Sequence, residues 1–272
     1  MKNLRTFLGS WAVGLALVAQ TPLAPPRLDT ATPTPVNATV PDDPELAKVL
    51  APYSDEIHKS FGRVIAHLPE EIGRPRDRKA VGLFPLGYFL ADIMREGAAK
   101  ASGREIRFGF TNSGGLRRNL PAGDLRVQDI YEVMPFENEL VIAEYTGQEI
   151  MQIVKEGIKR RGGEPCSGIL ASVTGDPKHP DVKITWSDGT AIDPAATYLA
   201  ATTDYLLANG DGVPTLKNGR NVQLTGVPLR QLIIDTCEAK GKAGKDVVAP
   251  RVNRYTLSAE VVEAIRSQSL NL

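Results

Sequence analysis

The stretch TNSGGLRRNLPAGD, Thr111–Asp124, is the most informative segment of this sequence for its fold and its function. It places Asn112 before the adjacent glycines Gly114 and Gly115, and Arg117 follows directly. Adjacent glycines let backbone N–H groups face a ligand without obstruction from side chains. An Asn amide and an Arg guanidinium can donate hydrogen bonds to phosphate oxygens. The stretch therefore predicts an anion-binding loop, and the alternative is a glycine-rich turn with solvated arginines.

Composition places the chain among soluble globular proteins. Of its 272 residues, 42% are hydrophobic and 24% are charged. The 32 Lys and Arg residues balance the 32 Asp and Glu residues, so the formal net charge is zero. A protein that binds nucleic acid needs a basic excess to displace counterions. We therefore expect no nucleic-acid partner, whereas a small anionic ligand needs only a local cluster of cations.

The N-terminus has the layout of a signal peptide. Lys2 and Arg5 precede a mostly apolar run, Phe7–Ala19, that is short for a membrane span. We expect residues 1–19 to be a signal peptide, with a retained anchor as the alternative, and the protein to be exported to the periplasm or the extracellular space. Residues 20–44 are rich in Pro and Thr and predict an extended linker. No stable membrane span is expected.

The two cysteines, Cys166 and Cys237, leave two alternatives open. An oxidising compartment would permit a disulfide between them. Two cysteines far apart in the sequence could equally be small buried hydrophobic residues, and this is the favoured interpretation. They are too few for a structural zinc site.

Hydrophobic spacing predicts one α+β domain over residues 45–272, with a mixed sheet and flanking helices. Helical spacing runs from Glu45 to Leu68, and a second helix follows Pro85 and stops near Gly103. Thr146 is expected to cap a third helix, and a last helix is expected at Leu229–Lys240. Strands are expected at Ile106–Phe110, Leu140–Tyr145, Gly168–Val173, Val182–Trp186 and Thr197–Thr202.

Two further segments could contribute to a binding site. In MPFENEL, Phe136 follows Pro135 in a stretch without periodicity, where the ring could be core or could face a ligand. In TTDYLLANGDGVPTL, a strand ends at a predicted loop that holds Tyr205 and Asp211. Asp between glycines is common in turns. An Asp carboxylate can also accept hydrogen bonds from a pair of sugar hydroxyls, and a Tyr ring can stack on a base.

Taken together, the segments resemble the C-terminal, substrate-binding domain of the 5′-nucleotidase family. That family shows Asn-Gly-Gly-Gly-Ile-Arg, then Pro-Phe-x-Asn, then Asp-Phe-Leu-Ala-x-Gly-Gly-Asp-Gly. The corresponding segments here are NSGGLR at Asn112–Arg117, PFEN at Pro135–Asn138 and DYLLANGDG at Asp204–Gly212. CSGI at Cys166–Ile169 and LGYFLADIM at Leu86–Met94 also fit. Their order and spacing carry the resemblance from Glu45 to about Val248.

The resemblance implies a role for each matched residue. Asn112, Gly114, Gly115 and Arg117 would contact the phosphate of a nucleotide. Phe136 and Tyr205 would stack on the two faces of the base. Asp211 would bind the ribose hydroxyls. The expected ligand is a nucleoside 5′-phosphate or a related nucleotide, and the expected process is nucleotide catabolism.

The sequence departs from the family pattern at the helix that begins near Pro85. The family places a further phosphate-binding Arg at the start of this helix, but here the segment reads GLFPLGYF and contains no Arg. Upstream basic residues could compensate, although a solvated basic turn is the favoured interpretation: Arg74, Arg76, Arg78 and Lys79. In the last segment, one Gly of the family pair is replaced by Asn209.

The larger departure concerns metal ligands. Full-length members carry a metallophosphatase domain whose two-metal site needs several His and Asp motifs, whereas this sequence has three His, none in such a motif: His58, His67 and His179. We therefore expect no cofactor and no catalytic residue in this chain, with divalent metal ions on a separate metallophosphatase partner. The alternatives are a secreted binding protein without a catalytic partner and a structural remnant with a decayed pocket.

Overall fold

The computed structural model describes residue 37, residues 39–74 and residues 81–272. The chain divides into two compact units, Met1–Val49 and Leu50–Leu272, and the strands found among the described residues lie in the second. The predicted signal peptide, most of the predicted linker and the basic residues Arg76, Arg78 and Lys79 lie outside the described residues. Within the described ranges, no helix is both long and apolar enough to cross a membrane.

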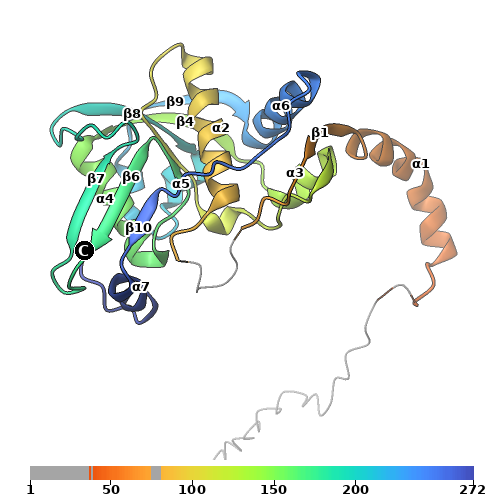
Figure 1. Ribbon diagram of the computed structural model, residues 1–272. Coiled ribbons are helices and arrows are strands. Elements are labelled where there is room, and N and C mark those ends of the chain that lie inside the picture. The colour runs from red at the N-terminus through yellow and green to blue at the C-terminus, as the bar shows by residue number, and fades with distance from the viewer. Residues whose placement is uncertain (1–36, 38, 75–80) are drawn as a thin grey trace, which may run out of the picture. The chain divides into compact units, whose positions relative to one another are not determined.

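A five-stranded mixed sheet forms the centre of the second unit (Figure 1). Its strand order is β5 (Cys166–Ser167), β2 (Phe108–Phe110), β8 (Thr197–Thr203), β4 (Glu139–Thr146) and β9 (Arg220–Pro228). Strands β2 and β8 are parallel, and the other neighbouring pairs are antiparallel.

Two smaller sheets and the helices complete the unit. One sheet has the order β10 (Tyr255–Leu257), β6 (Ile169–Thr174) and β7 (Asp181–Trp186), and the other pairs β1 (Val64–Leu68) with β3 (Gly123–Arg126). The helices are α1 (Pro44–Phe61), α2 (Pro85–Ser102), η1 (Ser113–Gly115), α3 (Val127–Val133), α4 (Gly147–Arg161), α5 (Asp204–Asn209), η2 (Pro214–Asn218), α6 (Leu229–Lys242) and α7 (Ala259–Arg266).

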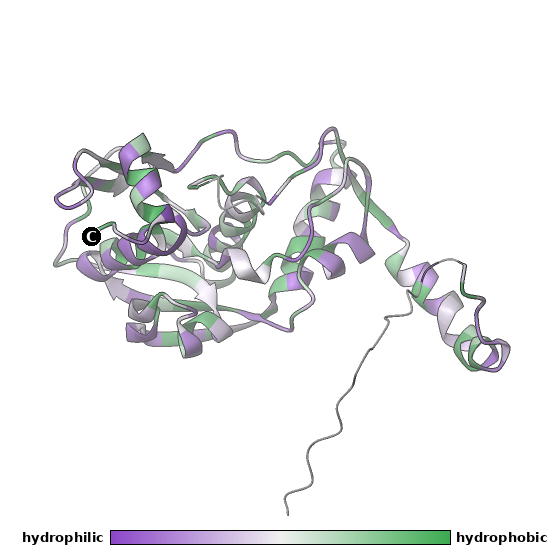
Figure 2. Cartoon of the chain, turned by 90° about the horizontal axis from the view of Figure 1, so that it is seen from below, coloured by the Kyte–Doolittle hydropathy of each residue, from purple (hydrophilic) through white to green (hydrophobic). Residues whose placement is uncertain are grey.

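The central sheet buries a hydrophobic core on each face. Along β4, Ile142 belongs to the core shared with α2, α3 and α6, whereas the next residue, Ala143, belongs to the core shared with α4 and α7. Ala201 and Ala200 of β8 divide in the same way, as expected for side chains that alternate across a strand. In Figure 2 the helices carry bands of both green and purple, because each buries only one side. The predicted α+β class with a mixed sheet and flanking helices is confirmed.

Helices with local start and stop signals begin and end where the sequence predicts. Helix α2 starts at Pro85, whose missing N–H costs nothing in the first turn, and ends at Gly103 with φ 66°. Helix α4 is capped by Thr146, whose hydroxyl accepts from the Glu149 N–H, while the Glu149 carboxylate accepts from the Thr146 N–H. The predicted strands and the last helix are also present.

Three predictions about local structure differ from the structure. The first helix ends at Phe61 rather than Leu68, and Val64–Leu68 is a strand paired with β3. Tyr205 lies on the short helix α5 instead of in a loop, because the Thr203 hydroxyl caps that helix by accepting from the Leu206 N–H. Most of the predicted linker, residues 20–44, lies outside the described residues. Its last residue, Pro44, is the first residue of α1.

The interpretation of the cysteines as buried hydrophobic residues is confirmed. Both are free and buried, Cys166 in the core next to α4 and Cys237 in the core next to α2. Burial raises the pKa of the Cys166 thiol to about 11 and that of the Cys237 thiol to about 12. Both are therefore neutral, unreactive thiols at physiological pH.

Candidate functional site

The topology of the central sheet brings the three signature segments to one edge. The NSGGLR segment follows the end of β2, and the DYLLANGDG segment follows the end of β8, which runs parallel to β2. The PFEN segment precedes β4, which runs antiparallel to β8 with Leu140 opposite Thr203. The ends of β2 and β8 and the start of β4 therefore lie at the same edge of the sheet, because these three strands are neighbours. The Glu139 N–H donates to Asp204 Oδ1 at 3.0 Å and joins the second segment to the third.

A short side-chain hydrogen bond joins the first segment to the third. Asn112 Nδ2 donates to Asp211 Oδ2 at 2.6 Å, although the two residues are 99 positions apart. A Cβ at Gly114 would lie 3.5 Å from Asn112 Nδ2 and 3.9 Å from Asp211 Oδ2. A Cβ at Gly115 would lie only 2.8 Å from Asn112 Oδ1, so glycine is required there to keep Asn112 in place. The predicted phosphate loop and the predicted ribose ligand thus form one cluster.

Asp211 lies in an unusual backbone conformation. Its φ is 38°, between Gly210 at 73° and Gly212 at 80°. A non-glycine residue with positive φ is uncommon and is enriched at binding sites, where the surrounding structure holds it. Here the holding contacts are the Asn112 bond and Arg160, whose Nη1 donates to the Asp211 carbonyl and lies 3.5 Å from Asp211 Oδ2. Both side-chain contacts fall on Oδ2, and none of the described hydrogen bonds or ion pairs involves Oδ1.

Arg117 and Phe136 link the first segment to the second. The Arg117 guanidinium carbon lies 5.1 Å from the centre of the Phe136 ring, within cation–π range. Phe136 is half-buried and packs against the core, while Arg117 is exposed. Among the described residues, Arg117 has no carboxylate partner within 4.0 Å. Its charge is held in place by an aromatic ring and is not neutralised by an internal ion pair.

Tyr205 lies at the same sheet edge but apart from this cluster. Its side chain is 46% exposed on the first turn of α5, two residues beyond the end of β8. The described ring contacts join other aromatic pairs and do not place Tyr205 against Phe136. The two predicted stacking residues therefore share an edge of the sheet without touching each other.

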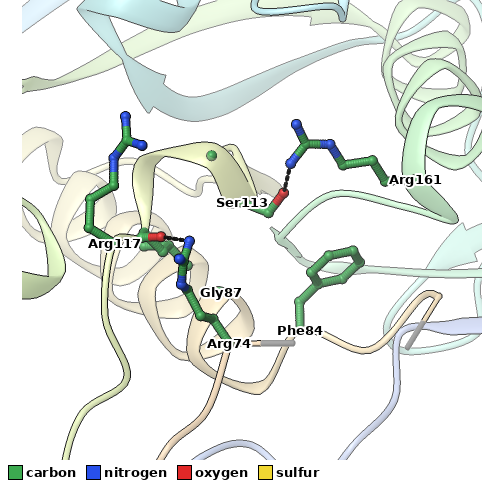
Figure 3. A pocket seen from close by; sticks show the side chains of 8 residues that line it. Arg74, Phe84, Gly87, Ser113, Arg117 and Arg161 are labelled. Atoms are coloured by element: carbon green, nitrogen blue, oxygen red, sulfur yellow. Dashed lines mark hydrogen bonds between the residues drawn. The ribbon is translucent and has the colours of Figure 1, made fainter. Parts of the chain in front are cut away.

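A pocket of about 360 Å³ lies beside the glycine loop (Figure 3). Of the seven predicted site residues, Gly114 and Arg117 line it. The other five do not: Asn112, Gly115, Phe136, Tyr205 and Asp211. The complete lining is Arg74, Phe84, Gly87, Ser113, Gly114, Leu116, Arg117 and Arg161. The favoured interpretation of Arg74 as part of a solvated basic turn is therefore wrong: Arg74 is half-buried and donates to the Leu116 carbonyl.

Arg161 and Glu164 are site residues that the sequence analysis missed. Arg161 Nη1 donates to Ser113 Oγ at 2.8 Å, and the Ser113 N–H donates to Glu164 Oε2 at 2.8 Å. They therefore hold the first residue of η1 through its side chain and its backbone. Burial raises the pKa of the Glu164 carboxyl, and the hydrogen bond from Ser113 and the nearby Arg161 and Arg160 oppose this rise. Nothing in the sequence distinguishes Arg161 from the other basic residues in the last turn of α4.

The histidines take no part in this site. His58 and His179 are exposed, and His67 Nδ1 lies 3.1 Å from Asp246 Oδ1 at the surface. No group of three or more His, Cys, Asp or Glu side chains suited to a metal ion occurs within residues 39–74 and 81–272. That metal ions belong to a partner remains a prediction.

Comparison with known proteins identifies the family. The family model described as 5′-nucleotidase, C-terminal domain, matches residues 64–218, which include all seven predicted site residues. The chain belongs to this family. The membership links the chain to nucleotide metabolism, and the predicted resemblance is confirmed.

Relatives of this 5′-nucleotidase C-terminal domain are found in several bacteria. The chain is 29% identical over 189 residues to the trifunctional nucleotide phosphoesterase protein YfkN of Bacillus subtilis (strain 168), covering 65% of this chain and 13% of YfkN. It is 33% identical over 122 residues to protein UshA of Escherichia coli (strain K12), covering 44% of this chain and 22% of UshA. The chain thus spans only a small part of either protein.

A solved structure has the same fold. The 5′-nucleotidase precursor from Thermus thermophilus superimposes with a TM-score of 0.64 at 24% identity, covering 81% of this chain and 44% of that one.

Proposed function

We propose that this chain is a nucleotide-binding, substrate-recognition domain that holds a nucleoside 5′-phosphate or a related nucleotide. The observation that carries the proposal is the meeting of the three signature segments at one sheet edge, with the Asn112–Asp211 bond at 2.6 Å joining the two that are most distant in the sequence. Strand ends of this kind are common places for ligand sites because a rigid sheet fixes the loops.

The charge arrangement favours a phosphate at the glycine loop. Arg117 carries a positive charge without an internal carboxylate partner among the described residues, and its fork of N–H groups suits phosphate oxygens. Asn112 uses one amide N–H on Asp211, which leaves a second N–H for the same phosphate. In this proposal Gly114 and Gly115 let the ligand approach the backbone.

The nucleoside would lie on the other side of Asn112. We propose that Asp211 Oδ1 accepts from a ribose hydroxyl, while Phe136 and Tyr205 supply the two aromatic faces for the base. The 46% exposed Tyr205 has room to move toward a base. Stacking tolerates any base, so this arrangement sets no base preference.

Hydrolysis in this proposal requires a metallophosphatase. Two metal ions would activate the attacking water there, and we propose that a separate exported chain holds them. This chain would contribute orientation and proximity of the substrate and would not contribute the nucleophile.

Isothermal titration calorimetry with AMP and adenosine tests the binding proposal. We expect AMP to bind more tightly than adenosine, because only AMP reaches Arg117. The absence of heat from both ligands would contradict the proposal. Adding a metallophosphatase from the same organism with Mn²⁺ and measuring phosphate release tests the second part. Unchanged release despite AMP binding would favour a binding protein without a catalytic partner.

A further inference from the structure

The segment that carries Phe136 lies between α3 and β4. Residues 134–138 form neither helix nor strand, so regular backbone hydrogen bonding does not fix the direction of the Phe136 ring. A ring that must be ordered when a ligand arrives loses part of its binding free energy to that ordering. The contacts that order this segment in advance therefore bear on how well the ring can hold a base.

The first turn of α6 holds the segment on both sides of its aromatic residue. The Leu229 N–H donates to the Asn138 carbonyl at 2.9 Å. The next residue, Arg230, donates from Nη1 to the Met134 carbonyl at 3.3 Å and from Nη2 to the Glu137 carboxylate. Two consecutive residues of one helix therefore fix the chain before and after the ring.

The Arg230 guanidinium is itself held in one orientation. Arg230 is buried, and its guanidinium carbon lies 4.0 Å from the centre of the Tyr131 ring. The Tyr131 ring in turn contacts the Phe61 ring, with 4.5 Å between the two ring centres. A guanidinium that lies over an aromatic face keeps its N–H groups in a fixed plane. The two hydrogen bonds to the segment therefore come from a rigid donor.

The ion pair of Arg230 contributes more to geometry than to stability. Its partner, the Glu137 side chain, is 83% exposed, and ion pairs of exposed carboxylates stabilise a fold only weakly. Glu137 is nevertheless the direct neighbour of Phe136, so the pair ties this surface segment to α6. Arg230 does not line the pocket, and it lies beyond residues 64–218, which match the family model.

We infer that Arg230 is a positioning residue for base recognition, which presents the Phe136 ring to the base of a nucleotide by fixing residues 134–138. Arg230 acts through the segment and does not touch the ligand. This inference rests on the proposed function, because it takes Phe136 as one of the two rings that stack on the base.

A double-mutant cycle between Arg230 and Phe136, measured by calorimetry with AMP, tests the inference. Phe136→Ala should lower AMP affinity about tenfold, because the base loses one stacking face. Arg230→Met keeps an apolar stem, removes the hydrogen bonds, and should lower AMP affinity about fivefold. The double variant should lose no more than about tenfold, because no ring remains to be positioned. A loss near fiftyfold, the product of the two single effects, would overturn the inference.

Two further variants separate positioning from a loss of folding. Glu137→Ala changes only an exposed side chain, so the urea midpoint should stay near that of the wild type while AMP affinity falls about threefold. Unchanged AMP affinity in this variant would overturn the inference even if Arg230→Met failed to fold. Arg230→Lys should recover part of the affinity that Arg230→Met loses, because Lys keeps the charge and loses the fork. An equal loss in both variants would contradict positioning by the charged group.

Arg107→Met is the matched control. Arg107 also lies over an aromatic ring, that of Trp186 at 4.6 Å, and also pairs with exposed carboxylates, those of Glu105 and Asp188. It makes these contacts at the start of β2, far along the chain from Phe136, so AMP affinity should not change. A loss equal to that of Arg230→Met would overturn the inference in favour of a general effect of such contacts on stability.

The outcomes also distinguish this inference from the proposed function. If the wild type binds AMP and Arg230→Met binds it equally well, the inference fails and the proposed function stands. Full AMP affinity in Phe136→Ala contradicts the stacking role of Phe136, and the inference fails with it. A wild type that binds no AMP contradicts the proposed function itself.

Discussion

The two ends of the β4–β8 strand pair differ in how their charges are balanced. At the end where Thr146 lies opposite Thr197, Glu149 accepts from Arg220 Nη1 at 2.9 Å and Nη2 at 2.7 Å. At the other end, where Leu140 lies opposite Thr203, Arg117 has an aromatic neighbour and no carboxylate among the described residues. Charges with internal partners stabilise the fold, whereas a fixed charge without one is available to a ligand.

Carboxyl groups at the two ends also respond differently to their surroundings. The hydrogen bonds from Arg220 lower the pKa of Glu149 to about 2. Behind the glycine loop, burial raises the pKa of Glu164. The ionised Glu149 carboxylate at the first end therefore stabilises the fold at neutral pH. Ionisation of Glu164, behind the glycine loop, costs free energy because the carboxyl is buried. Five substitutions test whether the two ends differ in this way.

Gly147→Ala should have the largest effect, at the end without the proposed site. The added Cβ would lie 2.1 Å from the backbone oxygen of Asp193, which cannot move without disturbing the cap of α4. We expect a loss of about 3 kcal/mol in the free energy of unfolding, measured by urea denaturation. A loss smaller than about 1 kcal/mol would show that this end is not rigid.

Arg117→Gln should abolish most of the contribution of phosphate to binding. We expect AMP affinity to fall about thirtyfold, or about 2 kcal/mol, with adenosine affinity unchanged, as measured by calorimetry. Arg118→Gln is the control, because the adjacent Arg118 is paired with Glu132 and is absent from the pocket lining. Equal losses for AMP and adenosine would contradict the assignment of Arg117 to the phosphate.

Asp211→Ala should weaken the nucleotide and the nucleoside alike. Both ligands carry the ribose that Asp211 is proposed to bind, so we expect about tenfold losses for AMP and adenosine. Asp211→Asn keeps a side-chain oxygen that can accept from the Asn112 amide. A loss of affinity in this variant therefore reports the contact with the ligand and not the support of the loop. A loss confined to AMP would place Asp211 at the phosphate instead.

Arg220→Gln should lower stability in a pH-dependent way. The folded-state pKa of Glu149 is depressed from 4.5 to about 2, so its contribution is present above about pH 4.5 and is lost as pH falls toward 2. We expect a loss of about 1 kcal/mol at pH 7, where this half-exposed pair is formed, and a much smaller difference from the wild type near pH 2, where about half of the Glu149 carboxyl is protonated in the folded state. Urea denaturation across this pH range measures it, and a difference independent of pH would contradict the ion-pair explanation.

Gly114→Ala should have the smallest effect on stability. Its nearest atoms, Asn112 Nδ2 at 3.5 Å and Asp211 Oδ2 at 3.9 Å, are at ordinary contact distance. We expect the free energy of unfolding to change by less than about 0.5 kcal/mol, while AMP affinity falls about threefold because the methyl group enters the pocket. A large loss of stability would show that both ends of the strand pair are equally rigid.

Local signals predicted much of this fold. Pro85 and Gly103 marked the ends of α2, and Thr146 with Glu149 marked the start of α4, because these signals act within a few residues. The end of α1 was missed for a physical reason. Val64 and Leu68 continue the helical spacing, but a separation of four residues fits a strand as well as a helix. Only pairing with β3, which is distant in the sequence, decides between them.

The candidate site was also only partly predictable, because some of its residues lie in recognisable segments and others are placed by contacts between distant parts of the chain. Arg117, Phe136 and Asp211 each lie in a recognisable segment, so the family resemblance was enough to predict that these three segments lie together. Arg161 belongs to no such segment, because its contact with Ser113 depends on how the end of α4 returns to the glycine loop. The sequence could not separate Arg74 from its basic neighbours either, because its place in the pocket depends on contact with Leu116.

The 99-residue separation of Asn112 and Asp211 has a consequence for the order of folding. Contacts between distant parts of a chain form slowly, because the intervening loop must be closed before they are gained. The bond joins segments that follow β2 and β8, so it can form only after these parallel strands have paired. During refolding, helical circular dichroism from α2 and α4 should therefore recover before the proposed nucleotide binding does.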